Sequence, residues 1–285
     1  MTLQMAKKGL YIQLTNLYDE RESDNIADWV MEYITGMKKI DRLMIHQQPM
    51  SNNQLRLLKQ LTKDLITHRP VQYVLGEAWF AGMKFYVNES VLIPRPETEE
   101  LVDWVLYTIQ NSKFKIHKLI DIGTGSGCIP ISLKKKLPQL SVTSLDISEA
   151  ALRVAKQNAD SLGVAIELSS IDFLNENSCN ELPIFDLIVS NPPYIKQSEE
   201  KNMPRNVLDF EPAIALFVPD EDALVFYKKI ALFSKTHLVK HGYIFLEINE
   251  TLGNEVVHLY ESIGYVVELK KDLQGKDRLL KITFD

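Results

Sequence analysis

A polar amide, two prolines and a tyrosine follow the apolar run at residues 185–189. Asn191 offers a side-chain carbonyl as an acceptor, and Tyr194 offers a flat ring face. Between them, Pro192 and Pro193 offer carbonyls without an N–H, and their rings keep the segment rigid. A rigid, acceptor-rich segment suits a planar group that donates hydrogen bonds, such as –NH2. Taken alone, the motif is explained better as an ordinary exit from a strand.

A glycine-rich loop follows a second apolar run at residues 118–122: Gly123, Thr124, Gly125, Ser126 and Gly127. Its G-x-G-x-G spacing is one residue shorter than the G-x-G-x-x-G pattern of dinucleotide sites. Asp146 ends the next strand and can accept from a ribose diol, while Asp172 and Phe173 could hold an adenine amino group and its ring face. Capping of helices and turns is the simpler explanation for the two acids. Together these residues describe a nucleoside pocket without an obvious pyrophosphate anchor.

The composition fits one large domain together with a smaller one. The chain has 285 residues, 45% of them hydrophobic, which is enough for a sizeable core. A net charge of −6 argues against a broad basic surface for nucleic acid. The two cysteines and six scattered histidines have no spacing typical of a metal site or a disulfide framework. Because a signal peptide and a membrane-spanning run are also lacking, we expect a cytoplasmic protein with no metal and no membrane partner.

The N-terminal part of the sequence predicts helices only. Apolar side chains recur with helical spacing from residue 3 to about residue 68, and no strand pattern interrupts them. We therefore expect a small helical domain over residues 1–70, either a packing appendage or a substrate-recognition domain. Residues 71–95 contain short apolar segments broken by glycines, which indicates a β-hairpin linker.

Residues 96–285 alternate between helix and strand patterns. Strands are expected at residues 118–122, 141–145, 165–168, 185–189, 243–247, 265–269 and 279–284. The alternation predicts an α/β fold with a doubly wound, mostly parallel sheet, whose last two strands form a hairpin. In such a sheet, ligands bind outside the carboxyl ends of the strands. Asp121, the glycine loop, Asp146, Asp172 and Asn191 all fall at these ends, which favours one shared site.

A rigid, charged passage at residues 91–99 leads into the first helix of this second domain. Pro96 suits the start of a helix, and Glu97 and Glu99 suit its first turn. Arg95 is flanked by prolines on both sides, which is an unusual way to build a linker. We therefore expect Arg95 to face the site as well.

The motifs at residues 121–127, Asp146 and residues 191–194 resemble those of class I S-adenosylmethionine-dependent methyltransferases that methylate planar amino groups. The closer resemblance is to the HemK/PrmC family, the glutamine-N5 methyltransferases of peptide chain release factors. It rests on motifs that follow a helical N-terminal domain: Arg69-Pro70-x-Gln72-Tyr73-x-x-Gly76, Phe80-x-Gly82, Ile93-Pro94-Arg95-Pro96-Glu97-Thr98-Glu99, Phe210-Glu211-Pro212 and Gly275-x-x-Arg278. The fold that this resemblance implies is the seven-stranded, Rossmann-like methyltransferase sheet.

The resemblance implies S-adenosyl-L-methionine as cofactor and S-adenosyl-L-homocysteine as product. The glycine loop would approach the methionine part, Asp146 the ribose, and Asp172 with Phe173 the adenine. Family members often have a tryptophan near the position of Phe173, and phenylalanine keeps an aromatic face there. The residues assigned to the cofactor are Asp121, Gly123, Thr124, Gly125, Ser126, Gly127, Asp146, Asp172, Phe173 and Asn191.

By the same resemblance, Asn191 and the Pro192 carbonyl would accept both amide hydrogens of a target glutamine, and Tyr194 would pack on its plane. These three residues are the expected catalytic set, with Pro193 and Arg95 as further substrate contacts. Two acceptors out of the amide plane can pull the nitrogen toward pyramidal geometry and free its lone pair for the methyl group. No dedicated base is needed, because the methylated amide cation loses its proton readily.

The expected partners are class 1 peptide chain release factors, with methylation at the glutamine of their Gly-Gly-Gln motif by a monomeric enzyme. A ribosomal-protein glutamine is the nearest alternative substrate. An adenine-N6 or guanine-N2 nucleic-acid methyltransferase is disfavoured by the acidic charge, so we expect no stable nucleic-acid binding. A nicotinamide oxidoreductase is disfavoured by the loop spacing, and a cofactor-free binding module by the joint presence of the glycine loop, Asp146 and the Asn191 motif.

Overall fold

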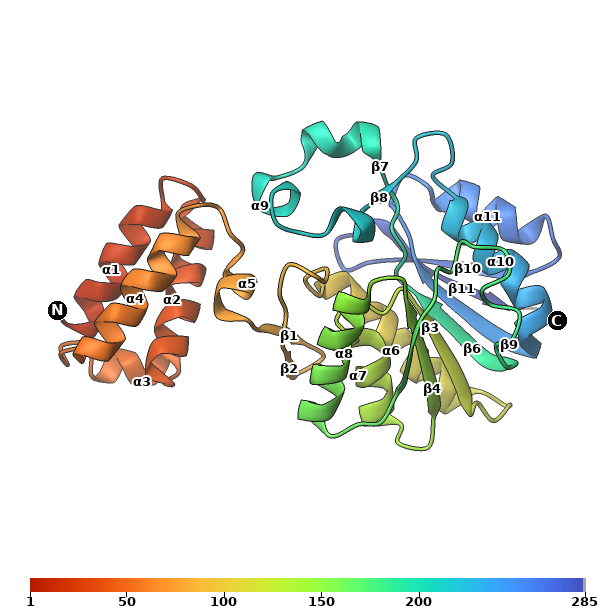
Figure 1. The fold of residues 1–285 in the computed structure, drawn as a ribbon, viewed down its shortest axis with the longest axis horizontal. Coiled ribbons are helices and arrows are strands. Elements are labelled where there is room, and N and C mark those ends of the chain that lie inside the picture. The colour runs from red at the N-terminus through yellow and green to blue at the C-terminus, as the bar shows by residue number, and fades with distance from the viewer. Residues whose placement is uncertain (284–285) are drawn as a thin grey trace. The chain divides into compact units, whose positions relative to one another are not determined.

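The computed structural model describes residues 1–283 and divides the chain into two compact units (Figure 1). The first unit comprises residues 1–77 and 204–210, and the second comprises residues 78–203 and the chain from residue 211 onward. Phe284, the last residue of the final predicted strand, lies outside the described residues. Among residues 1–283, no helix is both long enough and apolar enough to span a membrane.

The first unit is helical, as predicted; Figure 1 draws its residues 1–77 in red to orange and its residues 204–210 in teal. Its helices are α1 (Leu3–Leu14), α2 (Glu20–Thr35), α3 (Lys39–Met44), α4 (Asn52–Leu65), α5 (Val71–Leu75) and α9 (Arg205–Leu208). Local sequence sets the helix ends: the Ser51 and Gln54 side chains form a capping box at the start of α4, and Gly36 ends α2 in the left-handed conformation. Leu10, Leu14 and Leu65 meet in its core.

The prediction of a hairpin over residues 71–95 was wrong for its first part. Residues 71–75 form the helix α5, which packs against α2 and α4 and ends at Gly76 in the left-handed conformation. The short apolar segment before Gly76 suggested a strand, but its residues Val71, Tyr73 and Leu75 are buried in one short helical turn instead. The hairpin itself is shorter, with β1 (Ala78–Phe80) paired to β2 (Met83–Phe85).

The second unit contains the predicted seven-stranded sheet, in the order β10-β11-β9-β6-β3-β4-β5. Its strands are β3 (Lys118–Ile122), β4 (Ser141–Asp146), β5 (Glu167–Ser170), β6 (Phe185–Ser190), β9 (Leu238–Glu247), β10 (Val266–Lys271) and β11 (Asp277–Thr283). Only β11 runs antiparallel to its neighbours within this sheet, which confirms a mostly parallel α/β fold.

Helices cover both faces of the sheet, so each strand alternates between two cores. The helices α6 (Pro96–Asn111), α7 (Cys128–Lys136) and α8 (Glu149–Leu162) lie on one face, and α10 (Val225–His237) and α11 (Gly253–Glu261) lie on the other (Figure 1). Along β3, Leu119 packs into the core under α6, α7 and α8, and Ile120 packs into the core under α10 and α11. Burial on both faces explains the continuous apolar runs in the sequence.

The chain order reverses beside β3. From β3 the sheet proceeds through β4 to β5 on one side, and then resumes on the other side with β6. A crevice therefore opens at the carboxyl ends of β3 and β6, the place where doubly wound sheets bind ligands. The glycine loop follows β3, and Asn191 follows β6.

Candidate active site

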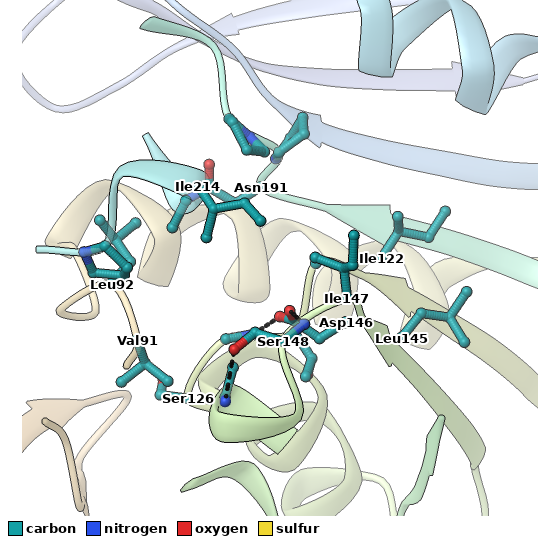
Figure 2. A pocket seen from close by; sticks show the side chains of 18 of the residues that line it. Val91, Leu92, Ile122, Ser126, Leu145, Asp146, Ile147, Ser148, Asn191 and Ile214 are labelled. Carbon is teal, nitrogen blue, oxygen red and sulfur yellow. Dashed lines mark hydrogen bonds between the residues drawn. The ribbon is translucent and has the colours of Figure 1, made fainter. Parts of the chain in front are cut away.

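A pocket lies at the carboxyl ends of β3, β4 and β6, entirely within the second unit (Figure 2). Most of the predicted site residues line it: Arg95, Gly123, Thr124, Gly125, Ser126, Asp146, Asp172, Phe173, Asn191, Pro192 and Pro193. Asp121, Gly127 and Tyr194 are not among the lining residues. Figure 2 shows Asp146 and Ser148 on one wall and Asn191 with Ile214 on another.

The glycines of the loop after β3 serve two different purposes. Gly123 and Gly125 have positive φ angles of 79° and 54°, and a side chain built on either would meet no atom within 4 Å. Their backbones therefore leave open space at the pocket. At Gly127 an added Cβ would lie 2.8 Å from Ile131 and 3.2 Å from Ala155. Gly127 accordingly permits close packing of α7 on α8.

Asp146 ends β4 and holds the loop in place. One carboxylate oxygen accepts a hydrogen bond from the Gly125 amide at 2.8 Å, and the other accepts from the Ser148 amide at 2.9 Å. Burial raises the pKa of this carboxyl group. Each oxygen keeps a further lone pair, so the carboxylate can still accept two hydroxyl groups from a ligand.

Buried polar atoms without partners gather beneath the loop. Among the described residues, no hydrogen bond reaches either carboxylate oxygen of Asp121, the hydroxyl of Thr124 or the hydroxyl of Ser126. Burial raises the pKa of Asp121 to about 7. Unsatisfied buried groups are costly, so their concentration here indicates a site that a polar ligand completes.

The far end of the pocket has an acid and apolar walls. One oxygen of Asp172 accepts from the Leu174 amide at 3.0 Å, so this acid also forms the turn that the sequence allowed. The Phe173 ring is buried and packs edge-on against Phe233. Ile147 and Leu174 also line this pocket and are 47% and 37% exposed, so they offer apolar surface that the sequence did not single out.

Asn191 is held by a chain of hydrogen bonds. Its amide nitrogen donates to the Thr98 hydroxyl at 3.1 Å, and Thr98 donates to a carboxylate oxygen of Glu247 at 2.6 Å. The other oxygen of Glu247 accepts from the Tyr194 hydroxyl at 3.3 Å. Tyr194 is thus directed toward Glu247, and its ring packs against the core on the α10 and α11 face of the sheet.

Glu247 lies at the end of β9 and is almost wholly buried. Burial raises the pKa of its carboxyl group to about 7, although the Thr98 hydrogen bond and the charge of Arg278 oppose the shift. Burial likewise raises the pKa of Tyr194. Glu247 is linked to the pocket residue Asn191 through Thr98. A buried carboxyl group with a pKa near neutrality in such a place is typical of functional sites.

Arg95 lines the pocket, but its charge is already engaged. Its guanidinium donates to Glu211 at 2.6 Å, and the other oxygen of Glu211 accepts from the Ile93 amide at 3.2 Å. The Glu211 side chain is 1% exposed, so this is a buried link between the passage before α6 and the segment that carries Ile214. Arg95 therefore connects two walls of the pocket.

Comparisons with known proteins match segments of both units. Residues 103–209 match the family model described as methyltransferase small domain, and residues 13–76 match the PrmC N-terminal domain. The release factor glutamine methyltransferase of Flavobacterium psychrophilum is 42% identical over 95% of this chain and 95% of its own. That of Bacteroides thetaiotaomicron is 38% identical over 94% of this chain and 95% of its own.

This chain belongs to the release factor glutamine methyltransferase family. The family resemblance inferred from the motifs is thereby confirmed. A solved methyltransferase structure from Pyrococcus furiosus has the same fold, with a TM-score of 0.52 at 18% identity, covering 82% of this chain and 98% of that one.

In this member of the release factor glutamine methyltransferase family, sequence reasoning assigned no role to Thr98, Glu211 or Glu247. Thr98 and Glu211 lie within motifs that supported the resemblance, but a motif does not say which side chains touch. Glu247 is the last residue of a predicted strand, and Asp121 and Asp146 lie at the carboxyl ends of two others. The rule that polar residues at carboxyl ends of parallel strands share a site therefore applied to Glu247 as well.

Proposed function

We propose that this chain transfers the methyl group of S-adenosyl-L-methionine to the side-chain amide nitrogen N5 of a glutamine in class 1 peptide chain release factors. The observation that carries the proposal is the 42% identity to a release factor glutamine methyltransferase over 95% of both chains. The pocket supports it, because an acceptor-rich segment and a largely apolar cleft lined by the glycine loop occur together. We assign the target glutamine to the Gly-Gly-Gln motif.

The residues of the pocket fit the cofactor. The open space beside Gly123 and Gly125 suits the amino-acid part of the cofactor. Asp121 is fully buried and does not line the pocket, so its unpartnered carboxylate would favour the amino group there through its charge rather than by direct contact. The spare lone pairs of Asp146 suit a ribose diol, and Asp172 with the apolar wall around Ile147 suits adenine. When bound, S-adenosyl-L-methionine supplies an electrophilic methyl group on its sulfonium sulfur.

The acceptors at the end of β6 prepare the substrate. The Asn191 side-chain oxygen and the Pro192 carbonyl each accept one hydrogen of the glutamine –NH2. They draw the nitrogen lone pair out of conjugation with the glutamine carbonyl, which makes the nitrogen nucleophilic and orients it. The surplus proton leaves readily from the methylated amide, so no histidine or cysteine is assigned a role. Tyr194 supports the segment from behind through Glu247.

The proposal is tested by asking which macromolecule accepts the methyl group. The purified chain is incubated with isotopically labelled S-adenosyl-L-methionine and, separately, a class 1 release factor, large-subunit ribosomal proteins, DNA and RNA. We expect label in the release factor alone. Label in a ribosomal protein would support the nearest alternative, and label in nucleic acid would overturn the proposal.

A further inference from the structure

The orientation of the Asn191 amide depends on two residues to which the proposed mechanism gives no contact with the substrate. Thr98 is buried on α6, and Glu247 is buried at the end of β9. We propose that Thr98 and Glu247 are positioning residues, which together hold the Asn191 side chain with its oxygen toward the substrate. This inference rests on the proposed function and deepens it, because it says what makes Asn191 an acceptor.

The Thr98 hydroxyl has a single proton to donate. Thr98 donates to Glu247 over 2.6 Å, a separation typical of an O–H bound to a charged oxygen. Having given its proton to Glu247, the Thr98 oxygen can only accept from Asn191. The –NH2 end of Asn191 must then face Thr98, as it does at 3.1 Å. Its carbonyl oxygen is left to point the other way.

The charge of Glu247 is what sets this direction. If the carboxyl group took up a proton, it could donate to Thr98, and the Thr98 proton would become free to bind the Asn191 oxygen. The Asn191 amide could then turn over and present –NH2 toward the substrate. Two facing –NH2 groups are both donors, so the glutamine would lose its acceptor.

The ionisable groups around the Glu247 carboxylate come from five elements: Glu97 on α6, Cys128 on α7, Tyr194 after β6, Tyr227 on α10 and Arg278 on β11. Arg278 favours the charged carboxylate, and Glu97 opposes it. Tyr194 donates to this carboxylate directly, and Asn191 is linked to it through Thr98. Both ends of residues 191–194 are therefore connected to the same buried carboxylate. Asn191 and Tyr194 are therefore positioned together.

If Thr98 and Glu247 served only the packing of the fold, their hydroxyl and charge would not affect kcat. Matched variants distinguish this structural role from the positioning role. Thr98→Val removes the hydroxyl at nearly constant volume, Thr98→Ser keeps it, and Thr108→Val makes the same change at a buried threonine farther along α6. We expect Thr98→Val to lower kcat by about 10²-fold, the scale of a misplaced catalytic group. Thr98→Ser restores most of that loss, and Thr108→Val leaves kcat unaffected.

Binding and pH dependence complete the kinetic test. In Thr98→Val, the KM for the release factor and the Kd for S-adenosyl-L-methionine, measured by calorimetry, change by no more than about twofold, because only the transition state loses an interaction. We expect the kcat–pH profile of the wild type to have an acid limb, and we expect Glu247→Gln to lower kcat and to remove that limb. A Thr98→Val protein with wild-type kcat, or a Glu247→Gln protein with an unchanged acid limb, would overturn the inference.

A readout without turnover keeps this inference separate from the proposed function. In ¹⁵N-labelled protein, nuclear magnetic resonance follows the side-chain –NH2 of Asn191. We expect one of its protons to be protected from hydrogen exchange in the wild type and in Thr108→Val, and exposed in Thr98→Val. If the wild type methylates no release factor, the proposed function fails while this protection still stands. Equal exchange in all three proteins contradicts the positioning role.

Discussion

At the scale of single residues, the pocket depends on buried polar atoms whose directions are fixed. Each carboxylate oxygen of Asp146 accepts one hydrogen bond from the protein, and its other lone pair can accept one from a ligand. Asn191 gives its –NH2 to Thr98 and keeps its oxygen. Asp121, by contrast, has no partner for its carboxylate among the described residues. The chemistry of the site therefore lies in what each side chain has left to offer.

Replacement of the acceptor tests this account of Asn191. Asn191→Ala removes the side-chain oxygen from the substrate while leaving Asp146 and the glycine loop in place. We expect kcat to fall by about 10²-fold or more, as for the loss of a preorganised polar group. The Kd for S-adenosyl-L-methionine should remain nearly that of the wild type by calorimetry. Wild-type turnover in this variant would remove Asn191 from the mechanism.

Burial of Glu247 makes stability depend on pH. Its pKa is raised from 4.5 to about 7, so the folded state keeps a proton that the unfolded state releases. The resulting contribution, about 3 kcal/mol from the shift in pKa, is fully present below the unfolded pKa and is lost as pH rises through the folded pKa. Between pH 4.5 and 7, the wild type should therefore lose stability relative to Glu247→Gln.

Urea unfolding of both proteins across this pH range measures the difference directly. The raised pKa of Asp121 acts in the same direction but is common to both proteins, so its effect cancels. A difference in unfolding free energy that does not vary with pH would show that Glu247 is not titrating there. The same ionisation that favours the working orientation of Asn191 thus costs stability.

At the scale of elements, local patterns predicted most of what is seen. The seven strands of the central sheet, the helices that cover it and the place of the glycine loop follow from periodicity and from turn residues, whereas the short strand pair of β7 (Ile195–Lys196) and β8 (Phe217–Val218) was not predicted. Residues 71–75 were assigned wrongly because a short apolar segment that ends at a glycine suits a strand and a short helix alike. The link from Thr98 to Glu247 spans 149 positions and depends on how α6 packs on β9, which no local pattern encodes.

Close packing of helices explains one glycine that the sequence assigned to the cofactor. Gly127→Ala places a methyl group 3.2 Å from Ala155 on α8 and 2.8 Å from the end of the Ile131 side chain on α7, at a φ of 78°. We expect a loss of unfolding free energy of about 2–4 kcal/mol, because crowding adds to the cost of a left-handed residue. Gly163→Ala, at a φ of 66° with no atom within 4 Å, is the matched control and should lose only about 1–2 kcal/mol.

Urea unfolding of these two glycine variants compares their losses. Equal losses would mean that α7 and α8 adjust freely around residue 127. A larger loss at Gly127 would assign this glycine to the scaffold rather than to direct cofactor contact.

At the scale of the whole molecule, a helical unit precedes a methyltransferase sheet, and the sequence comparisons cover both. The net charge of −6 agrees with a protein substrate better than with a nucleic acid. The motifs could predict the family, but the pocket alone describes only a nucleoside cofactor beside an amide-binding segment. The identity of the substrate comes from the similarity along the entire chain.

Cofactor choice has a whole-molecule consequence, because a ligand that binds only the folded state stabilises it. At a concentration of about 100 times its Kd, S-adenosyl-L-methionine should add about 2.7 kcal/mol to the unfolding free energy. Thermal unfolding with this ligand should show a raised Tm, whereas NAD at the same concentration should leave the Tm unchanged. Stabilisation by NAD instead would favour an oxidoreductase.

The most direct test of the central claim is the position of the transferred methyl group. The chain is incubated with a class 1 release factor and S-adenosyl-L-methionine carrying a deuterated methyl group, and the digested release factor is analysed by tandem mass spectrometry. The account predicts one labelled methyl group on the side-chain nitrogen of the Gly-Gly-Gln glutamine, and none when that glutamine is replaced by glutamate. A labelled methyl group on any other residue, or an unlabelled release factor, would contradict it.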